Sequence, residues 1–551
     1  MSTHRRHFLL SGAALAVAGC RPGPGADAPL PPGGFVGQSP GRGHALRDTT
    51  SGQPGKSGSA PQPAVTRRVH TLITGGGVAG LAAARALRLK GRDDFALLEL
   101  EDTAGGNARA GQLGGLPCPL GAHYLPVPSN RAPQVQDLLE ELGLRQRVAG
   151  RWVYDERHLC HSPQERLFFQ GQWQPGLLPV DGVGPGTLDQ YRRFAARVRQ
   201  AQRASAYAIP VPKWPLPLDQ LALDAMPFEA WLGTQGLTDP HLRAYLDYCC
   251  RDDYGAGLAT VSAWAGLHYF ASRHGFTAPG EDNAEAEPVL TWPEGNGWLT
   301  AQLAAPLGER LHTGQAVLRI TPTRNGVDVL ALNTATAQVE RWLARRCIVA
   351  LPVLVAARVV QNAPASVQQA LQAAAQAVRY APWVVTNLHL RQPLADRGGA
   401  APAWDNVLHT EVGTGSGGLG YVNATHQSLL PVPGPTVLTH YRALGDDPTA
   451  RQQVLARPWT HWYQQTLADL HPAHPELAHR VAEASVARHG HAMAVPTPGF
   501  MRKIGALRSP LLNSSLSKSS GLAFAHSDWA GYSVFEEAFA QGHVAGCRAL
   551  T

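Results

Sequence analysis

The sequence has little lysine and methionine, and its N-terminal apolar run is too short to cross a bilayer. Lysine occurs only five times, so the formal net charge of +7 rests mostly on arginine. The basic residues are scattered, without a long Lys/Arg block or interleaved aromatic residues, which is not the pattern of a nucleic-acid-binding surface. We therefore expect no nucleic-acid partner and attribute the basic balance to diffuse surface charge.

What the chain does contain is the composition of an ordinary globular protein, with 44% hydrophobic and 16% charged residues. A length of 551 residues predicts two or three domains. Residues 21–66 are rich in Pro, Gly and Ser and are expected to form a tether, whose more apolar segments 34–37 and 43–47 dock on the globular body. After residue 67, short β-branched runs alternate with Ala/Leu-rich stretches, which is typical of an α/β fold.

Residues 1–20 have the pattern of an export signal. Arg5 and Arg6 precede the apolar run Phe8–Gly19 and resemble a twin-arginine (Tat) signal, and Ala16–Cys20 resembles a bacterial lipobox. We expect cleavage before Cys20, which would carry the lipid that anchors the protein to a membrane. The alternative is an uncleaved N-terminal anchor. Both interpretations place the bulk of the protein outside the cytoplasm, on the periplasmic or cell-envelope face.

Six cysteines remain after Cys20, at irregular spacing. Cys347 lies in a strand-like run and Cys547 in a predicted C-terminal helix, so both are expected to be buried free thiols. The adjacent residues Cys249 and Cys250 are either a redox-active pair or part of a core. Because a disulfide between neighbours is strained, packing in a core is the favoured interpretation.

A glycine-rich segment carries the strongest functional signal. A strand predicted at Val69–Thr74 runs into Gly75, Gly77 and Gly80, and a helix is predicted at Leu81–Leu89. This arrangement is typical of a dinucleotide site. The first glycine allows a tight turn, the second lets the backbone approach a pyrophosphate, and the third allows close packing of helix and strand. The N-terminus of the helix then holds the phosphates.

An acidic residue follows about 20 residues further on, as a dinucleotide site requires. Glu99 lies in a second predicted strand, Phe95–Leu100. Its carboxylate is expected to accept hydrogen bonds from the ribose hydroxyls of an adenosine.

The segment after Glu99 distinguishes between FAD and NAD. It contains Gly105, Gly106, Asn107 and Arg109, and here the chain resembles the flavin-dependent amine oxidase and phytoene desaturase superfamily, whose segment reads D-x-x-G-G-R. The resemblance implies FAD as the cofactor, with the paired glycines forming a second backbone loop near its pyrophosphate. Asn107 stands where the superfamily has arginine, and Arg109 is expected to serve the same end.

A second match to the superfamily lies near the C-terminus. The hydrophobic segment 522–528 ends in Asp528, which by this resemblance contacts the ribityl or pyrophosphate part of FAD. His526 replaces the usual glycine, and Tyr532 belongs to a stretch that resembles W-S-G-Y. The final helix is expected at Phe535–Ala549, with its N-terminus facing the O2/N1 edge of the flavin, where the helix dipole would stabilise negative charge on reduced flavin.

The resemblance implies a Rossmann-like FAD-binding domain of the GR2 type, discontinuous in sequence, with an inserted α+β substrate domain. A weaker match around Val317 implies that the backbone there brackets the adenine, although an ordinary β-hairpin explains this segment equally well. The expected FAD-binding parts are residues 67–150, 301–360 and 486–551, and the expected parts of the substrate domain are residues 151–300 and 361–485.

Two neighbouring residues are candidate catalytic residues by resemblance. His123 and Tyr124 follow Gly121-Ala122 in an element that passes near the flavin ring in the superfamily. His489 and His491 have no companion Cys or Asp cluster, so no metal site is expected. With so few lysines, none can be assigned to the neighbourhood of flavin N5.

The remaining candidates lie in a segment rich in aromatic and acidic residues. Asp252 or Asp253 would bind a cationic amine in an aromatic-walled pocket, and Trp264 and His268 would share a helical face. The alternative is that the aromatic residues form core and that the acids cap a helix at Leu258–Phe270.

The favoured hypothesis is an amine-oxidase-like enzyme with non-covalent FAD. It would remove a hydride from a C–N or C–C bond of a small organic substrate, and oxygen or a membrane quinone would reoxidise the flavin. One alternative is a desaturase- or isomerase-like flavoprotein that acts on a lipid. Another is a flavin-binding lipoprotein without turnover.

Overall fold

The computed structural model describes residues 29–44, 62–160, 163–204, 207–211, 216–273, 275–280, 288–395, 397–413, 417–427, 432–512 and 520–550. The signal-like segment with Cys20 and much of the expected tether lie outside the described residues. Among the residues that are described, no helix combines the length and apolar character needed to cross a membrane.

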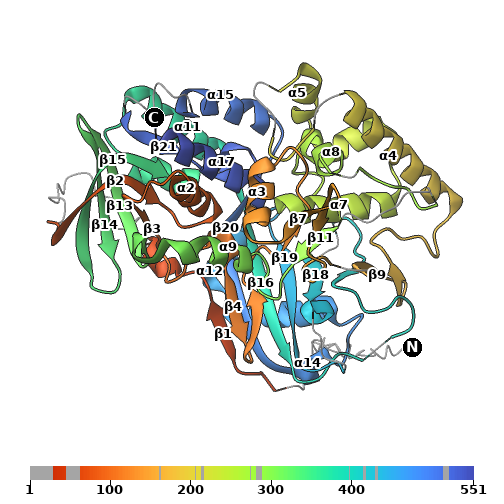
Figure 1. The fold of residues 1–551 in the computed structure, drawn as a ribbon. Coiled ribbons are helices and arrows are strands. Elements are labelled where there is room, and N and C mark those ends of the chain that lie inside the picture. The colour runs from red at the N-terminus through yellow and green to blue at the C-terminus, as the bar shows by residue number, and fades with distance from the viewer. Residues whose placement is uncertain are drawn as a thin grey trace, which may run out of the picture.

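One sheet has a parallel core built around the glycine-rich segment (Figure 1). Its parallel strands are β12 (Leu311–His312), β3 (Phe95–Leu98), β2 (Val65–Thr74), β15 (Gln338–Val349) and β21 (Leu522–Phe524). The first half of β15 also pairs antiparallel with a hairpin. Strands from three distant parts of the chain therefore form one Rossmann-like sheet, which confirms the predicted fold.

The hairpin consists of β13 (Gln315–Thr323) and β14 (Gly326–Asn333), and a bulge follows Val317. Helices α2 (Val78–Leu89) and α17 (Phe535–Arg548) pack together against the parallel strands. This contact needs a small residue, because a Cβ atom at Gly542 would lie 1.9 Å from the carbonyl oxygen of Ala79.

A second, larger sheet is mostly antiparallel and lies below the first in Figure 1. In spatial order its strands are β1 (Gly33–Val36), β20 (Val481–Val495), β16 (Arg379–Leu390), β19 (Thr436–Ala443), β18 (Gly418–Asn423), β17 (Asp405–Leu408), β9 (Glu165–Phe169) and β10 (Gln172–Pro175). β20 stays in this sheet up to Val495, beyond the boundary expected at residue 485. β1 confirms that the apolar segment 34–37 docks on the globular body.

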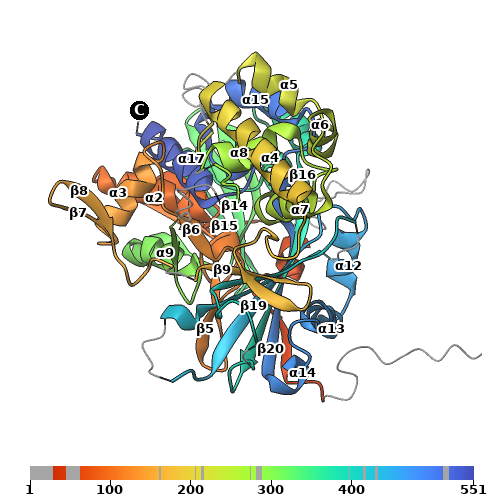
Figure 2. The ribbon, with the colours of Figure 1, turned by 90° about the vertical axis from the view of Figure 1, so that its right-hand side faces the viewer.

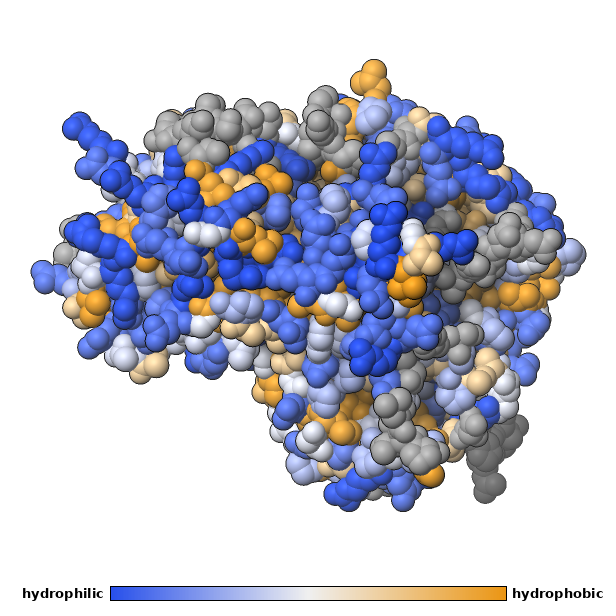
Figure 3. Space-filling view, in the orientation of Figure 1, coloured by the Kyte–Doolittle hydropathy of each residue, from blue (hydrophilic) through white to orange (hydrophobic). Residues whose placement is uncertain are grey.

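Helices cover one side of the inserted region, at the upper right of Figure 1 and the top of Figure 2. They are α4 (Pro185–Ala204), α5 (Leu218–Asp224), α6 (Phe228–Thr234), α7 (Pro240–Tyr254) and α8 (Ala263–Ala271). Their buried faces share one hydrophobic core with residues of both sheets. Mostly hydrophilic side chains cover the face of the molecule shown in Figure 3.

Smaller elements complete the described fold. They are β4 (Ala110–Leu113), β5 (Leu116–Pro119), β6 (Tyr124–Pro126), β7 (Arg145–Val148), β8 (Arg151–Tyr154), β11 (Val289–Thr291), α3 (Pro133–Glu141), α9 (Gly297–Ala304), α10 (Val353–Val359), α11 (Ala365–Ala377), α12 (Ala450–Ala456), α13 (Trp459–Leu470), α14 (Leu477–Arg480) and α15 (Phe500–Leu512).

Several expected boundaries were wrong by a few residues. Helix α2 begins at Val78, so Gly80 lies in its first turn, and β3 ends at Leu98, so Glu99 follows the strand. The segment 258–270 is not one helix, because α8 begins only at Ala263. Its N-cap is Ser262, whose side chain accepts a hydrogen bond from Ala265 N. The acids therefore do not cap this helix, and instead lie in the last turn of α7.

The cysteines Cys249, Cys250 and Cys347 are free and buried, as the packing interpretation predicted. Cys547 is free but only partly buried, and its Sγ lies 3.6 Å from His543 Nε2. This part of the prediction was wrong, because one face of α17 is turned toward solvent.

Candidate active site

The glycines predicted to hold a dinucleotide lie in a closely packed turn. Gly75 has φ = +97°, and a Cβ atom there would lie 2.4 Å from the carbonyl oxygen of Ala350. A Cβ atom at Gly80 would lie 1.8 Å from the carbonyl oxygen of Gly75. Gly77 opposes Gly106 so closely that a Cβ atom on Gly106 would lie 3.1 Å from Gly77 Cα. The two glycine loops thus present bare backbone side by side, which suits a pyrophosphate.

Glu99 joins the end of β3 to the glycine turn. Its carboxylate accepts hydrogen bonds from Gly76 N at 2.7 Å and Glu101 N at 2.9 Å. Burial raises the pKa of Glu99, although both hydrogen bonds oppose this. Each carboxylate oxygen can accept a further hydrogen bond, so the carboxylate can also bind ribose hydroxyls.

The second glycine loop is held by its own side chains. Arg109 Nε donates to the carbonyl oxygen of Gly106 at 3.1 Å, and Asn107 Nδ2 donates to the carbonyl oxygen of Ala492 at 2.7 Å. Arg109 is nearly buried. In this structure it lies against its own loop, so it can fix the loop's shape as well as supply positive charge.

Asp528 is buried between the two sheets: it follows β21 of the first sheet and contacts Tyr380 on β16 of the second. It accepts hydrogen bonds from Val353 N at 2.9 Å and from the hydroxyl of Tyr380, and its own amide donates to His526 Nδ1 at 3.2 Å. Burial alone would raise the pKa of Asp528, but His526, Tyr380 and Val353 together lower it. The carboxylate is therefore charged and fixed at the position predicted to contact FAD.

Tyr532 and His268 pack together in the core. Their ring centroids are 5.0 Å apart, and His268 also stacks on Trp264 at 4.6 Å. His268 Nε2 hydrogen-bonds the carbonyl oxygen of Ala208, and burial lowers its pKa to about 3. Its predicted helical face is confirmed, but both side chains are almost fully buried. This environment favours a packing role for His268 over its predicted catalytic role.

Three carboxylates lie close together, and we call them the acidic cluster: Glu165, Asp252 and Asp405. Glu165 and Asp405 are paired neighbours on the adjacent strands β9 and β17. Tyr124 donates to Asp252 and Tyr248 donates to Asp405, each at 3.4 Å. All three acids keep some accessible surface. Within the described part of the chain, none of them forms an ion pair.

Burial makes these carboxyls hard to ionise. It raises the pKa of Glu165 to about 7, and that of Asp252 to about 7 with help from the charge of Asp253. The pKa of Asp405 is also raised, by burial and then by the charges of Asp252 and Glu165. Asp253 differs, because Arg273 pairs with it at 2.9 Å. Of the two predicted amine-binding acids, only Asp252 thus belongs to the cluster.

Aromatic rings border the acidic cluster. His123 stacks on Tyr441 with centroids 4.3 Å apart and lies 5.5 Å from Trp404, which is 5.9 Å from Tyr124. Burial lowers the pKa of His123 to about 3, so its ring is neutral at physiological pH. The predicted residues His123, Tyr124 and Asp252 therefore do lie together.

A short loop connects the acidic cluster to the glycine loops. Leu120 N donates to the carbonyl oxygen of Arg109, and Ala122 N donates to that of Asn107, both at 2.9 Å. Tyr124, two residues further on, donates its hydroxyl hydrogen to Asp252. Within the described residues, no group of three His, Cys, Asp or Glu side chains is placed to hold a metal ion.

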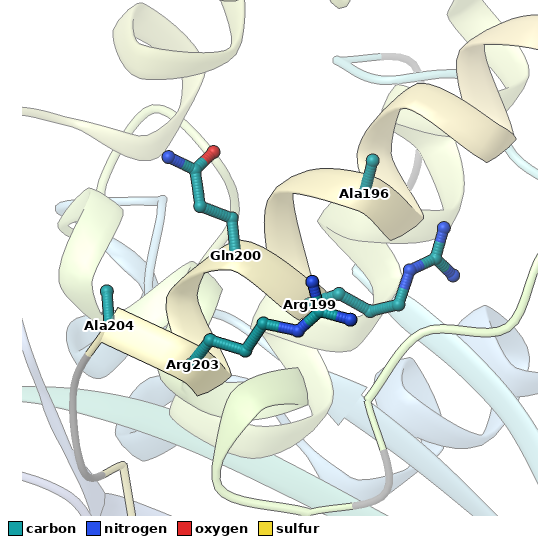
Figure 4. Close-up of a pocket in the computed structure, with 5 residues that line it drawn as sticks. All are labelled: Ala196, Arg199, Gln200, Arg203 and Ala204. Carbon is teal, nitrogen blue, oxygen red and sulfur yellow. The ribbon is translucent and has the colours of Figure 1, made fainter.

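Sequence reasoning missed Glu165, Asp405, Trp404 and Tyr441, whereas Tyr248 begins the segment rich in aromatic and acidic residues that it had singled out. These four come from β9, from β17 and the residue before it, and from β19, and no local motif marks them. A further open hollow of ≈ 380 Å³ lies on the outer surface of α4 (Figure 4). It contains none of the candidate residues.

The chain belongs to the family of flavin-containing amine oxidoreductases, whose model matches residues 78–550. It is therefore an FAD-dependent oxidoreductase, and its own residues fit FAD. The bare backbone of the two glycine loops would face the pyrophosphate, Glu99 accepts a hydrogen bond from Gly76 N in the first loop, and Asp528 is a second buried acid.

Known proteins place this chain within that family's fold. A putrescine oxidase structure bound to putrescine superposes with a TM-score of 0.62 at 17% identity, covering 88% of this chain and 99% of that one. Cyclohexylamine oxidase from Brevibacterium oxydans IH-35A gives a TM-score of 0.61 at 17% identity, with the same coverage.

One curated relative matches over a short region. Coproporphyrinogen III oxidase from Mycobacterium leprae (strain TN) is 42% identical over 105 residues, which span 19% of this chain and 22% of that protein.

Proposed function

We propose that this chain oxidises a small cationic amine at a carbon–nitrogen bond, and that the acidic cluster binds the ammonium group. The observation that carries this proposal is the placement of three carboxylates that form no ion pair among the described residues, one short loop from the glycine loops. FAD, when bound, accepts the hydride of this reaction.

The electrostatics of the acidic cluster favour a cation. Paired like charges on adjacent strands repel each other, and burial adds a desolvation cost. Glu165 and Asp405 carry this cost without a compensating charge from the described chain. An ammonium group would lower their raised pKa values and supply that charge. Tyr124, Tyr441 and Trp404 can add cation–π attraction.

Asp252 has the chemistry of a proton acceptor in this reaction. An ammonium group must lose a proton before its carbon can give up a hydride. A group with a pKa of about 7 is matched to that task near neutral pH. His123, with a pKa of about 3, is a poor base there. Its neutral ring can instead form part of the wall without repelling a cation.

The names of relatives suggest a second candidate substrate, a porphyrinogen. The acidic cluster argues against it, because a tetrapyrrole that carries carboxylates would meet like charge. A lipid substrate would leave the three acids without a partner.

The remaining features complete the proposal. FAD is held without a covalent bond, and oxygen or a membrane quinone reoxidises it. The twin-arginine pattern supports export of the folded, FAD-loaded chain, and the lipobox-like sequence supports a lipid anchor at Cys20.

The decisive test is anaerobic flavin reduction. Putrescine, butylamine and the uncharged analogue 1,4-butanediol would be added to the FAD-loaded protein while flavin absorbance is recorded. We expect an amine to bleach the flavin and the diol to leave it unchanged. The amine proposal would be contradicted if a porphyrinogen or a lipid bleached the flavin and no amine did. It would also be contradicted if none of these compounds bleached it. Acid precipitation of the same protein should release the flavin into the supernatant.

A further inference from the structure

Residues 33–42, which we call the strap, lie along the edge of the large sheet. Strand β1 pairs in parallel with β20, from Gly33 opposite Ala484 to Val36 opposite Ala487. A Cβ atom at Gly33 would lie 2.3 Å from the carbonyl oxygen of Ala484, so the strap and the sheet are in close contact. The guanidinium of Arg488 lies 3.9 Å from the centre of the Phe35 ring. The first half of the strap is therefore fixed to the substrate-side sheet.

The second half of the strap contacts the FAD-binding side. Ser39 N donates to Glu101 Oε1 at 2.9 Å. Arg42 donates through both terminal nitrogens to Asp102, at 2.8 and 3.2 Å. Such two-point contacts between guanidinium and carboxylate fix orientation as well as distance. The strap thus joins the two sheets through a segment that also begins the second glycine loop.

Between these ends, the strap touches the two side chains that follow the paired glycines. The carbonyl oxygen of Gly37 accepts a hydrogen bond from Arg109 Nη1 at 3.4 Å. Gln38 Nε2 donates to Asn107 Oδ1 at 3.3 Å and lies 2.8 Å from His489 Nδ1.

His489 extends this chain of contacts. Its Nε2 hydrogen-bonds the carbonyl oxygen of Leu120 at 2.7 Å, at the start of the loop that leads to Tyr124. Because Nδ1 then accepts from Gln38 while Nε2 carries the proton, one tautomer satisfies both contacts. Gln38 therefore links the glycine loop, β20 and the loop next to the acidic cluster.

We propose that the strap is part of the FAD site and retains the cofactor by holding Asn107 and Arg109 in place. Asn107 is shorter than the arginine of the superfamily and cannot span the same distance. The strap adds to the contacts that Asn107 and Arg109 already make with Ala492 and Gly106. The proposal rests on the family's use of FAD and does not depend on which substrate is oxidised.

The test measures FAD release from holoenzyme variants. Gln38→Ala and Arg42→Ala leave β1 intact, and Arg151→Ala, on the exposed strand β8, is the matched control. Release would be followed as the rise in flavin fluorescence after dilution. Each strap variant removes two hydrogen bonds worth about 1 kcal/mol each, so release should be about fivefold faster if one of them acts on the cofactor and about thirtyfold faster if both do. The control should release FAD at the wild-type rate.

Thermal unfolding of the FAD-free protein separates this role from a merely structural one. If the strap acts on the cofactor, Gln38→Ala should unfold near the wild-type temperature without FAD and gain less stability on FAD addition. The proposal is overturned if both strap variants release FAD as slowly as Arg151→Ala. It is also overturned if they lose the same stability with and without FAD.

Discussion

The ionisation of the Asp252 carboxyl should make the binding of a cationic ligand depend on pH. Its pKa is raised to about 7, mainly by burial, so it is mostly protonated at pH 5.5 and ionised at pH 8.5. Affinity for an unreactive diammonium ligand should therefore rise with pH across this range. Asp252→Asn should bind it at least about tenfold more weakly at pH 8.5, the effect of losing one charged hydrogen bond, and with a flatter pH profile.

The measurement is the dissociation constant of the ligand, from perturbation of flavin absorbance at several pH values. Asp181→Asn is the control, because Asp181 is exposed and lies outside the acidic cluster. An Asp252→Asn profile as steep as that of the control would show that another group governs binding.

Sequence motifs predicted individual residues only where the residues that act together are also close in the sequence. Gly75, Gly77 and Gly80 were predictable because consecutive residues make the turn. Glu165 and Asp405 were not, because their pairing depends on the parallel register of β9 and β17, which no sequence period reveals. Asp253 was as plausible as Asp252 in the sequence, but Arg273, just beyond the C-terminal end of α8, is its ion-pair partner in the structure.

At the scale of elements, the close contact between α17 and α2 holds in place the helix that begins at the glycine turn. Gly542→Ala would place a methyl group against the carbonyl of Ala79 and push the helices apart. We expect a loss of about 1–3 kcal/mol in unfolding free energy, and weaker FAD retention because α2 begins at the glycine turn. Val544→Ala, at a partly exposed position of the same helix, is the control.

Chemical denaturation and FAD content together check this prediction. Equal stability of Gly542→Ala and Val544→Ala would mean that the helices can separate without cost. The elements themselves were largely predictable, since β2 and β3 are short apolar runs, α2 is rich in Ala and Leu, and α17 follows the C-terminal match to the superfamily. The ends of elements were less predictable: Ser262, rather than an acid, caps α8, because the two acids lie in the last turn of α7 and α8 begins only at Ala263.

For the whole molecule, the acidic cluster couples folding to pH because the fold brings together carboxylates from β9, α7 and β17. In the unfolded chain such groups titrate near pH 4, whereas Glu165 and Asp252 titrate near 7 when folded. The folded state therefore holds more protons between these values. The stability that these groups contribute is fully present below about pH 4 and is lost as pH rises through about 7.

It follows that the variant Glu165→Gln/Asp252→Asn/Asp405→Asn should lose less stability than the wild type between pH 5 and pH 8. A diammonium ligand should restore stability to the wild type at pH 8 more than at pH 5, because it pairs with carboxylates that are charged only at the higher pH. Thermal unfolding of both proteins across this range, with and without putrescine under anaerobic conditions, measures both effects. Parallel profiles of stability against pH for the two proteins would show that folding does not raise the pKa values of the three acids. A ligand effect independent of pH would place the cation elsewhere in the molecule.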